Sequence, residues 1–233
     1  MKKIGIIVFI VALAIGVTIA SVFSFGKAAG NLFSFKIGFG GVKGSGNVQT
    51  DKRTVDNFKA VEVGGVFIVE ITAQRDFSVE VEADDNLLPL IKTESDGETL
   101  KIETEKRFST RSPIKLRISA PDVENLHISG ASKVSVVNLN NDSFSVDSSG
   151  ASKITIEGAT KTFTVDMSGA SKLDAENFKS ENVSVDASGA SCATVSVSSD
   201  LKVDLSGASK VVYYGSPSNL EKRTSGASSV TGK

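Results

Sequence analysis

The stretch Ser129-Gly130-Ala131-Ser132 returns five more times along the second half of the chain, and it decides the fold. The glycines of the six copies are Gly130, Gly150, Gly169, Gly189, Gly207 and Gly226. The intervals between them are 20, 19, 20, 18 and 19 residues. A motif that recurs at a nearly constant interval of this size is typical of a solenoid protein, in which each repeat forms one coil.

Apolar and polar residues alternate on both sides of each glycine. Four residues before it stand Leu126, Val146, Val165, Val185 and Val203, and four after it Val134, Ile154, Leu173, Ala193, Val211 and Val230. A period of two indicates strands with one buried face. One repeat cannot bury that face alone, but stacked repeats can. The pattern predicts an all-β fold: a single β-solenoid of about 19-residue coils, each with two short strands that meet at the tetrapeptide corner, and a variable return segment.

Residues 51–125 lack the tetrapeptide but also contain alternating segments, such as 58–63 and 66–71. We interpret them as degenerate coils of the same solenoid, which then extends over residues 51–231 with its complete repeats over 126–231. Asp84 and Asp85 begin an interruption that we expect to form a short helical turn with an aspartate cap.

The chain begins with two lysines and continues from residue 4 to residue 25 without a charge or a proline. A helix of 22 residues spans about 33 Å, enough to cross a bilayer. We therefore predict one hydrophobic N-terminal helix within residues 1–26, acting either as an uncleaved signal anchor or as a signal peptide. Residues 27–50 are rich in glycine and phenylalanine and are expected to form a tether.

This N-terminus predicts export, because lysines flanking a hydrophobic segment stay on the inner side of the membrane. The solenoid is then either anchored in the cell envelope by residues 4–25 or secreted after cleavage. Lys+Arg and Asp+Glu number 26 and 27, for a net charge of −1. A nucleic-acid-binding protein normally carries a basic excess, so nucleic acid is not an expected partner.

Two columns of charge flank the repeated corner. Three residues before the glycine stand His127, Asp147, Asp166, Asp186, Asp204 and Arg223, and three residues after it Lys133, Lys153, Lys172, Cys192, Lys210 and Ser229. One interpretation is a binding face for an unknown surface ligand, a protein or a glycan, or a ladder of calcium sites. The other is a solvated face that keeps the rod soluble, with each lysine offsetting the repulsion between aspartates if the columns face one another. The candidate binding residues are Asp147, Asp166, Asp186, Asp204, Lys133, Lys153, Lys172 and Lys210.

These columns do not favour catalysis. Carboxylates stacked about 5 Å apart match the separation in retaining glycosidases, but an active site needs one pair whose pKa values are driven apart. Because the four aspartates of the column have similar surroundings, no pair of them is expected to have pKa values that differ in this way. Cys192 and His127, the only cysteine and the only histidine, fall in different columns and distant coils. We therefore expect no enzymatic activity, no metal site and no cofactor.

The serines that follow each Gly-Ala pair form a further column. They are Ser132, Ser152, Ser171, Ser191, Ser209 and Ser228. A flat array of hydroxyls could bind ice, but the neighbouring charges favour a role in the turn, where serine hydroxyls satisfy nearby backbone groups.

The chain resembles the head GIN domain, a family described as heads of auto-transporter adhesins in the bacterial cell envelope. The resemblance covers about residues 50–230. It rests on an ordered pattern followed by the Ser-Gly-Ala-Ser coils: Phe58, Val61, Val63, Gly64, Gly65, Phe67 and Val69, then Val79, Val81, Asn86, Leu87, Leu88, Leu100 and Ile102. It implies a function in adhesion.

We conclude from the sequence that this is a non-enzymatic cell-envelope protein that displays a solenoid for binding or adhesion. The alternative is a membrane-anchored sensor or regulatory accessory protein, which requires an uncleaved N-terminal helix. In the final repeat, Lys222 takes an inward position and Arg223 replaces the aspartate. Charge at the last strand discourages further pairing, so a monomer or weak self-association is expected.

Overall fold

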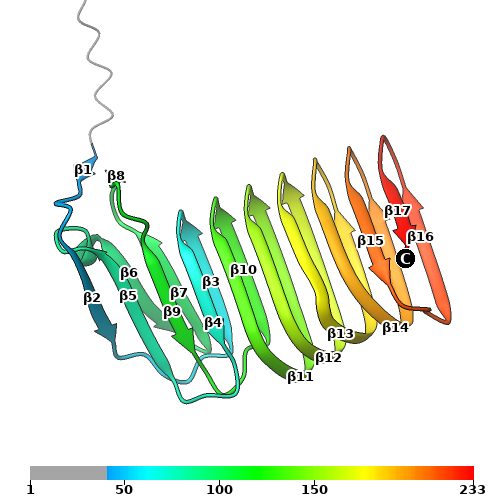
Figure 1. The fold of residues 1–233 in the computed structure, drawn as a ribbon, viewed down its shortest axis with the longest axis horizontal. Helices are drawn as coiled ribbons and strands as arrows, with labels where there is room; N and C mark the ends of the chain where they lie inside the picture. The colour runs from blue at the N-terminus through cyan, green and yellow to red at the C-terminus, as the bar shows by residue number, and fades with distance from the viewer. Residues whose placement is uncertain (1–40) are drawn as a thin grey trace, which may run out of the picture. The chain divides into compact units, whose positions relative to one another are not determined.

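The computed structural model describes residues 41–233, which form an all-β unit (Figure 1). The predicted N-terminal helix and residues 27–40 of the predicted tether lie outside the described residues. Within residues 41–233, no helix has the length and apolar character of a membrane span.

The strands of the second half are long and parallel. They are β10 (Asn125–Gly130), β11 (Lys133–Gly150), β12 (Lys153–Gly169), β13 (Lys172–Ala187), β14 (Cys192–Leu205), β15 (Lys210–Tyr214), β16 (Asn219–Thr224) and β17 (Ser229–Gly232). Each of β11 to β14 is nearly one complete coil: it runs along one face, bends, and returns along the other face to the next corner (Figure 1). The β-solenoid is therefore confirmed. The expected return segment is instead part of a continuous strand, which bends where the register of its pairing shifts, for example between Val136 and Leu139.

The predicted columns are in register. Val146 pairs with Val165, and Val165 with Val185, while the neighbouring Asp147, Asp166 and Asp186 pair with one another in the same way. The valines are buried and the aspartates are exposed. Alternation along a strand thus divides each coil into an apolar interior and a charged exterior.

Phenylalanine fills the widest part of this interior. Phe144 and Phe163 are stacked with their ring centroids 6.1 Å apart. Phe178 meets Phe163 edge to face at 5.0 Å. All three rings are fully buried, and such pairs contribute about 0.5–1.5 kcal/mol beyond the area that they bury.

The corner requires glycine at its centre. Gly169 has φ +88°, and a Cβ there would lie within 3.0 Å of the carbonyl oxygen of Gly150 in the preceding coil. Without that atom, the coils approach closely enough for Ala170 N to donate to Gly150 O at 2.8 Å. The same arrangement recurs at the other corners.

The first half of the chain closes one end of the solenoid. Its strands are β1 (Val42–Lys43), β2 (Val48–Arg53), β3 (Ala60–Gly65), β4 (Ile68–Thr72), β5 (Ser78–Asp84), β6 (Ile91–Asp96), β7 (Thr99–Thr104), β8 (Phe108–Ser109) and β9 (Lys115–Ser119), with a 3-10 turn η1 (Leu88–Leu90) between β5 and β6. β3 and β4 form a coil that pairs in parallel with β10 and β11 on one side. On the other side they pair with β7 and β9, which occur later in the chain.

The coils of this half are therefore not stacked in chain order. After β4 the chain passes to the end of the stack, forms antiparallel pairs β5–β9, β6–β7 and β2–β5, and returns to β10. Residues 42–50, which we placed in a tether, include β1 and part of β2. Their side chains are mostly exposed, so no apolar pattern marks these residues as strands. Charged edge strands of this kind oppose pairing with other chains.

Segment 84–91 contains the predicted short helical turn, but the predicted aspartate cap is wrong. Leu87 is the N-cap of η1, and no side chain caps it. Asp85 instead accepts hydrogen bonds from Asn47 and from the backbone N–H of Asn86. Contacts to a segment 38 residues away in the chain outweigh the local preference for a cap.

Candidate functional site: two charged columns and a polar groove

The aspartate column lies on the face formed by the second arms of β11 to β14. Asp147, Asp166, Asp186 and Asp204 are in register and exposed. His127 adjoins the column at one end, with its Nδ1 atom 3.8 Å from Asp147 Oδ2. The stack provides a row of carboxylates at the strand spacing of about 4.8 Å.

This column continues beyond the repeats. Glu62 pairs with His127, and Lys101 pairs with Glu62, so β3 and β7 add one acidic and one basic side chain to the row. Sequence analysis missed both residues because the first half lacks the tetrapeptide on which the copies were aligned. The pairing of β3 with β10 is the observation that identifies them.

Partial burial and repulsion along the column raise the pKa of one member. The pKa of Asp166 is raised, firstly by partial burial and secondly by the charges of Asp186 and Asp147. A raised pKa means that the ionised carboxylate destabilises the folded state above that pKa. Protonation removes this destabilisation as the pH falls from above the raised pKa to below the ordinary pKa of an aspartate.

We therefore predict a pH-dependent effect of Asp166→Asn. At pH 7 the melting temperature should rise by about 1–2 °C, because a neutral amide is less costly to bury in part and removes the repulsion. The difference should shrink toward zero near pH 4. Asp204→Asn is the matched control, since Asp204 pairs in register with Arg223 and should gain less. A melting temperature that falls at pH 7, or a difference that does not depend on pH, would contradict the assignment.

The lysine column lies on the other face. Lys133, Lys153 and Lys172 are in register and exposed, and Cys192 and Lys210 continue the row. Within residues 41–233, no ion pair joins these lysines to the four aspartates of the other column. The corner separates the strand arms on which the two columns stand, so the lysines do not offset the repulsion between aspartates.

The serine column is buried except at its last member, Ser228, which is partly exposed. Ser132, Ser152, Ser171, Ser191 and Ser209 are each at most 3% exposed. Ser132 Oγ accepts from Phe67 N at 3.1 Å and donates to Gly65 O at 3.1 Å, and Ser209 Oγ donates to Ser206 O at 2.9 Å. These hydroxyls satisfy backbone groups at the corners, as expected for turn chemistry. They present no flat array to ice.

A polar groove lies at the bend of the coils, away from the two columns. Its volume is about 740 Å³. The side chains that line it are Gln74, Asp122, Glu124, Asn140, Asn141, Asp142, Ser143, Thr160, Lys161 and Glu181, together with Ala159. The bend is the variable part of each repeat, so sequence analysis did not single these residues out.

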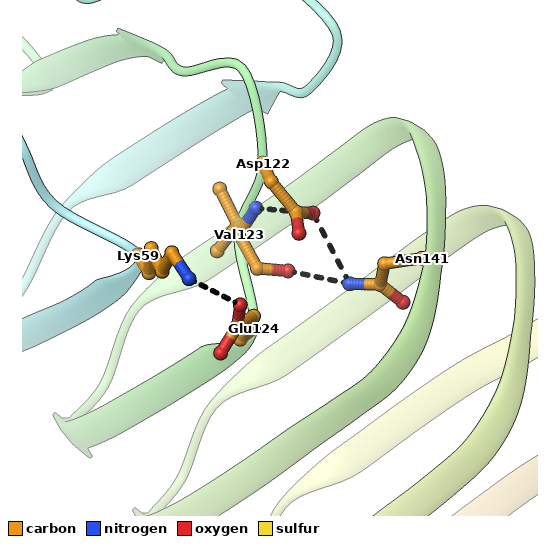
Figure 2. A network of polar contacts seen from close by, with 5 residues as sticks. All are labelled: Lys59, Asp122, Val123, Glu124 and Asn141. Atoms are coloured by element: carbon orange, nitrogen blue, oxygen red, sulfur yellow. Dashed lines mark hydrogen bonds and ion pairs between the residues drawn. The ribbon is translucent and has the colours of Figure 1, made fainter.

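Figure 2 shows how one wall of this groove is held. Asn141 Nδ2 donates to Asp122 Oδ1 at 3.2 Å and to Val123 O at 2.9 Å. Lys59 Nζ donates to Glu124 Oε1 at 2.9 Å, and this contact raises the pKa of the lysine. Lys161, which also lines the groove, pairs with Asp142 at 2.7 Å. The groove therefore presents paired charges to solvent.

The described residues offer neither a cluster of metal ligands nor a cysteine–histidine pair. In the part of the chain that the structure describes, no group of three or more His, Cys, Asp or Glu side chains could hold a metal ion. Cys192 stands in β14 and His127 in β10, with β11, β12 and β13 between these strands. The structure does not bring the cysteine and the histidine together.

The chain is similar to solved structures, one of which has a TM-score above 0.5. One described as a "putative adhesin" from Bacteroides fragilis is 19% identical, covers 83% of this chain and 100% of that chain, and has a TM-score of 0.69. A "putative adhesin" from Parabacteroides merdae is 15% identical over 82% of this chain and 98% of its own, with a TM-score of 0.46. A "putative lipid binding protein" from Parabacteroides distasonis is 16% identical over 82% and 99%, with a TM-score of 0.47.

Among curated proteins, none is similar to this chain. At 19% identity, the structure from Bacteroides fragilis shows the fold alone. The sequence family described as "putative auto-transporter adhesin, head GIN domain" matches residues 57–217. That match covers most of the chain and both halves of the solenoid. The protein therefore belongs to the head GIN domain family.

Proposed function

We propose that this chain is a non-enzymatic protein of the cell envelope that displays its β-solenoid for binding or adhesion. One observation carries the proposal: four aspartates stand exposed and in register, and no lysine of the other column pairs with them in residues 41–233. A row of like charges that only His127 approaches, at one end, is costly to maintain for solubility alone. It offers a periodic ligand one contact in each coil.

The family supports display outside the cell, because its description is that of an adhesin head. The hydrophobic segment 4–25, which follows two lysines, also supports export across the membrane. The proposed partner is a surface ligand, a protein or a glycan, that carries cations or hydroxyl groups at a spacing compatible with the coils. The lysine column on the other face provides a second, cationic face for an acidic ligand.

The test is binding by the full chain to glycans, matrix proteins and whole cells. The informative variant replaces the four aspartates by asparagine: Asp147, Asp166, Asp186 and Asp204. Its matched control replaces the four lysines by glutamine: Lys133, Lys153, Lys172 and Lys210. Loss of binding by tenfold or more in one variant, with the other unchanged, would assign the ligand to that face. Binding that neither variant reduces would contradict the proposal for these columns.

A further inference from the structure

Asp84, at the end of β5, is a buried carboxylate with an unused oxygen. The residue is 2% exposed. Its Oδ2 atom accepts a hydrogen bond from Thr110 Oγ1 at 2.7 Å. Its Oδ1 atom is buried and has no hydrogen-bond partner in residues 41–233, and no lysine or arginine of that range forms an ion pair with it. Burial of a carboxylate with a single hydrogen bond is costly unless something else compensates the charge.

The carboxylate lines a cavity of about 350 Å³ at the closed end of the solenoid. Three segments that are distant in the chain build it: residues 43–46, Asp84 itself and residues 109–111. Gly44 lies directly over Asp84, because a Cβ there would come within 3.0 Å of its Oδ2. The chain therefore places glycine where the backbone approaches the carboxylate most closely.

The neighbouring contacts hold this cavity in shape. Ser45 N donates to Asn86 Oδ1 at 2.9 Å, and Asn86 Nδ2 donates to Lys43 O at 2.8 Å. Asp85 accepts from Ser45 Oγ and from Asn47 Nδ2. These hydrogen bonds lower the pKa of Asp85. A second carboxylate thus stays ionised beside the first, and it is already satisfied by protein donors.

We propose that Asp84 binds a divalent cation of the calcium type in this cavity. Among the residues that line the cavity, the side chains that carry oxygen are those of Asp84, Ser45, Ser109 and Thr110. Oxygen ligands without histidine or cysteine suit calcium or magnesium rather than zinc or copper. With one free carboxylate the site should be weak, with a dissociation constant of about 10⁻⁴–10⁻³ M, as in extracellular calcium modules.

The cation would connect the segment after β1 to β5 and to the segment after β8. Its role would therefore be to stabilise the closed end, which is separate from ligand binding by the charged columns. The cavity also holds Lys43 and Arg111, both exposed. The competing occupant is the guanidinium of Arg111, turned inward to pair with Asp84. If a cation occupies the cavity, calcium should stabilise the protein; if Arg111 pairs with Asp84, calcium should have no effect.

The experiment measures the melting temperature of the full chain after chelator treatment, with and without calcium chloride. With about 10 mM calcium, we expect a rise of about 3 °C or more, which grows with the logarithm of the calcium concentration above the dissociation constant. Asp84→Asn should abolish this rise, and in chelator it should be at least as stable as the parent, because the buried charge is gone. Asp96→Asn, at an exposed position outside the cavity and outside both charged columns, is the matched control and should keep the full rise.

A second variant secures the test if Asp84→Asn fails to fold. Thr110→Ala removes the hydroxyl that orients the carboxylate. It should raise the dissociation constant for calcium about tenfold, as measured by titration calorimetry. The proposal is overturned if calcium has no effect on the parent, or if the rise persists in Asp84→Asn. It is also overturned if, in chelator, Arg111→Ala lowers the melting temperature of the parent but not that of Asp84→Asn. That result would mean that Arg111 pairs with Asp84 in place of a cation.

Discussion

Replacing Val165 with aspartate is expected to cost several kcal/mol and to unfold the central coils. Val165 is fully buried in β12 between Val146 and Val185, so the new carboxylate would stand between apolar columns without a partner. Urea denaturation of the variant and the parent measures the effect as a shift of the midpoint.

The matched control is Asp166→Ala, one residue along the same strand. Its side chain faces solvent, so the free energy of unfolding should change by well under 1 kcal/mol. Equal losses from the two substitutions would mean that the two sides of β12 have been assigned wrongly.

The second large effect is expected at the corner. Gly169→Ala introduces a Cβ that would lie within 3.0 Å of the backbone oxygen of Gly150, and neither atom can move without shifting a whole coil. Gly169 also has φ +88°, which alanine adopts only with strain. We expect a loss of about 3 kcal/mol or more, read from thermal or urea denaturation.

Gly97→Ala separates the two causes of this loss. Gly97 also has a positive φ, +62°, but a Cβ there would meet nothing within 4 Å. Backbone strain alone should cost about 1–2 kcal/mol. If Gly169→Ala costs no more than Gly97→Ala, then the close approach between coils does not limit the residue at the corner.

The fold of the repeats could be predicted because each copy shows the same pattern of apolar and polar residues. At positions such as Val165 and Asp166, the alternation of buried and exposed residues recurs in each copy, so one alignment assigns the whole column to a side. The corner serines could be interpreted by the same reasoning, since a short hydroxyl beside a turn has few partners other than the backbone.

The closed end could not be predicted in the same way. β2 is paired through its backbone, and its side chains are mostly exposed, so no periodic apolar pattern marks it. The placement of β7 beside β3 depends on pairing between distant segments, which a single sequence does not specify. Nothing in the sequence distinguishes Asp84 from its neighbour Asp85, and only the approach of residues 43–46 and 109–111 makes Asp84 part of a cavity.

The equivalence of the corners has a consequence for how such a chain can change in length. Ala170 N contacts Gly150 O just as Ala151 N contacts Gly130 O, so the two junctions are interchangeable. Removing residues 151–169 would join Gly150 to Ala170 and recreate a corner of the same kind. Duplication or loss of one coil in the gene would then lengthen or shorten the rod by about 4.8 Å while both ends stay intact. The reach of the molecule can thus evolve separately from the surface that it carries.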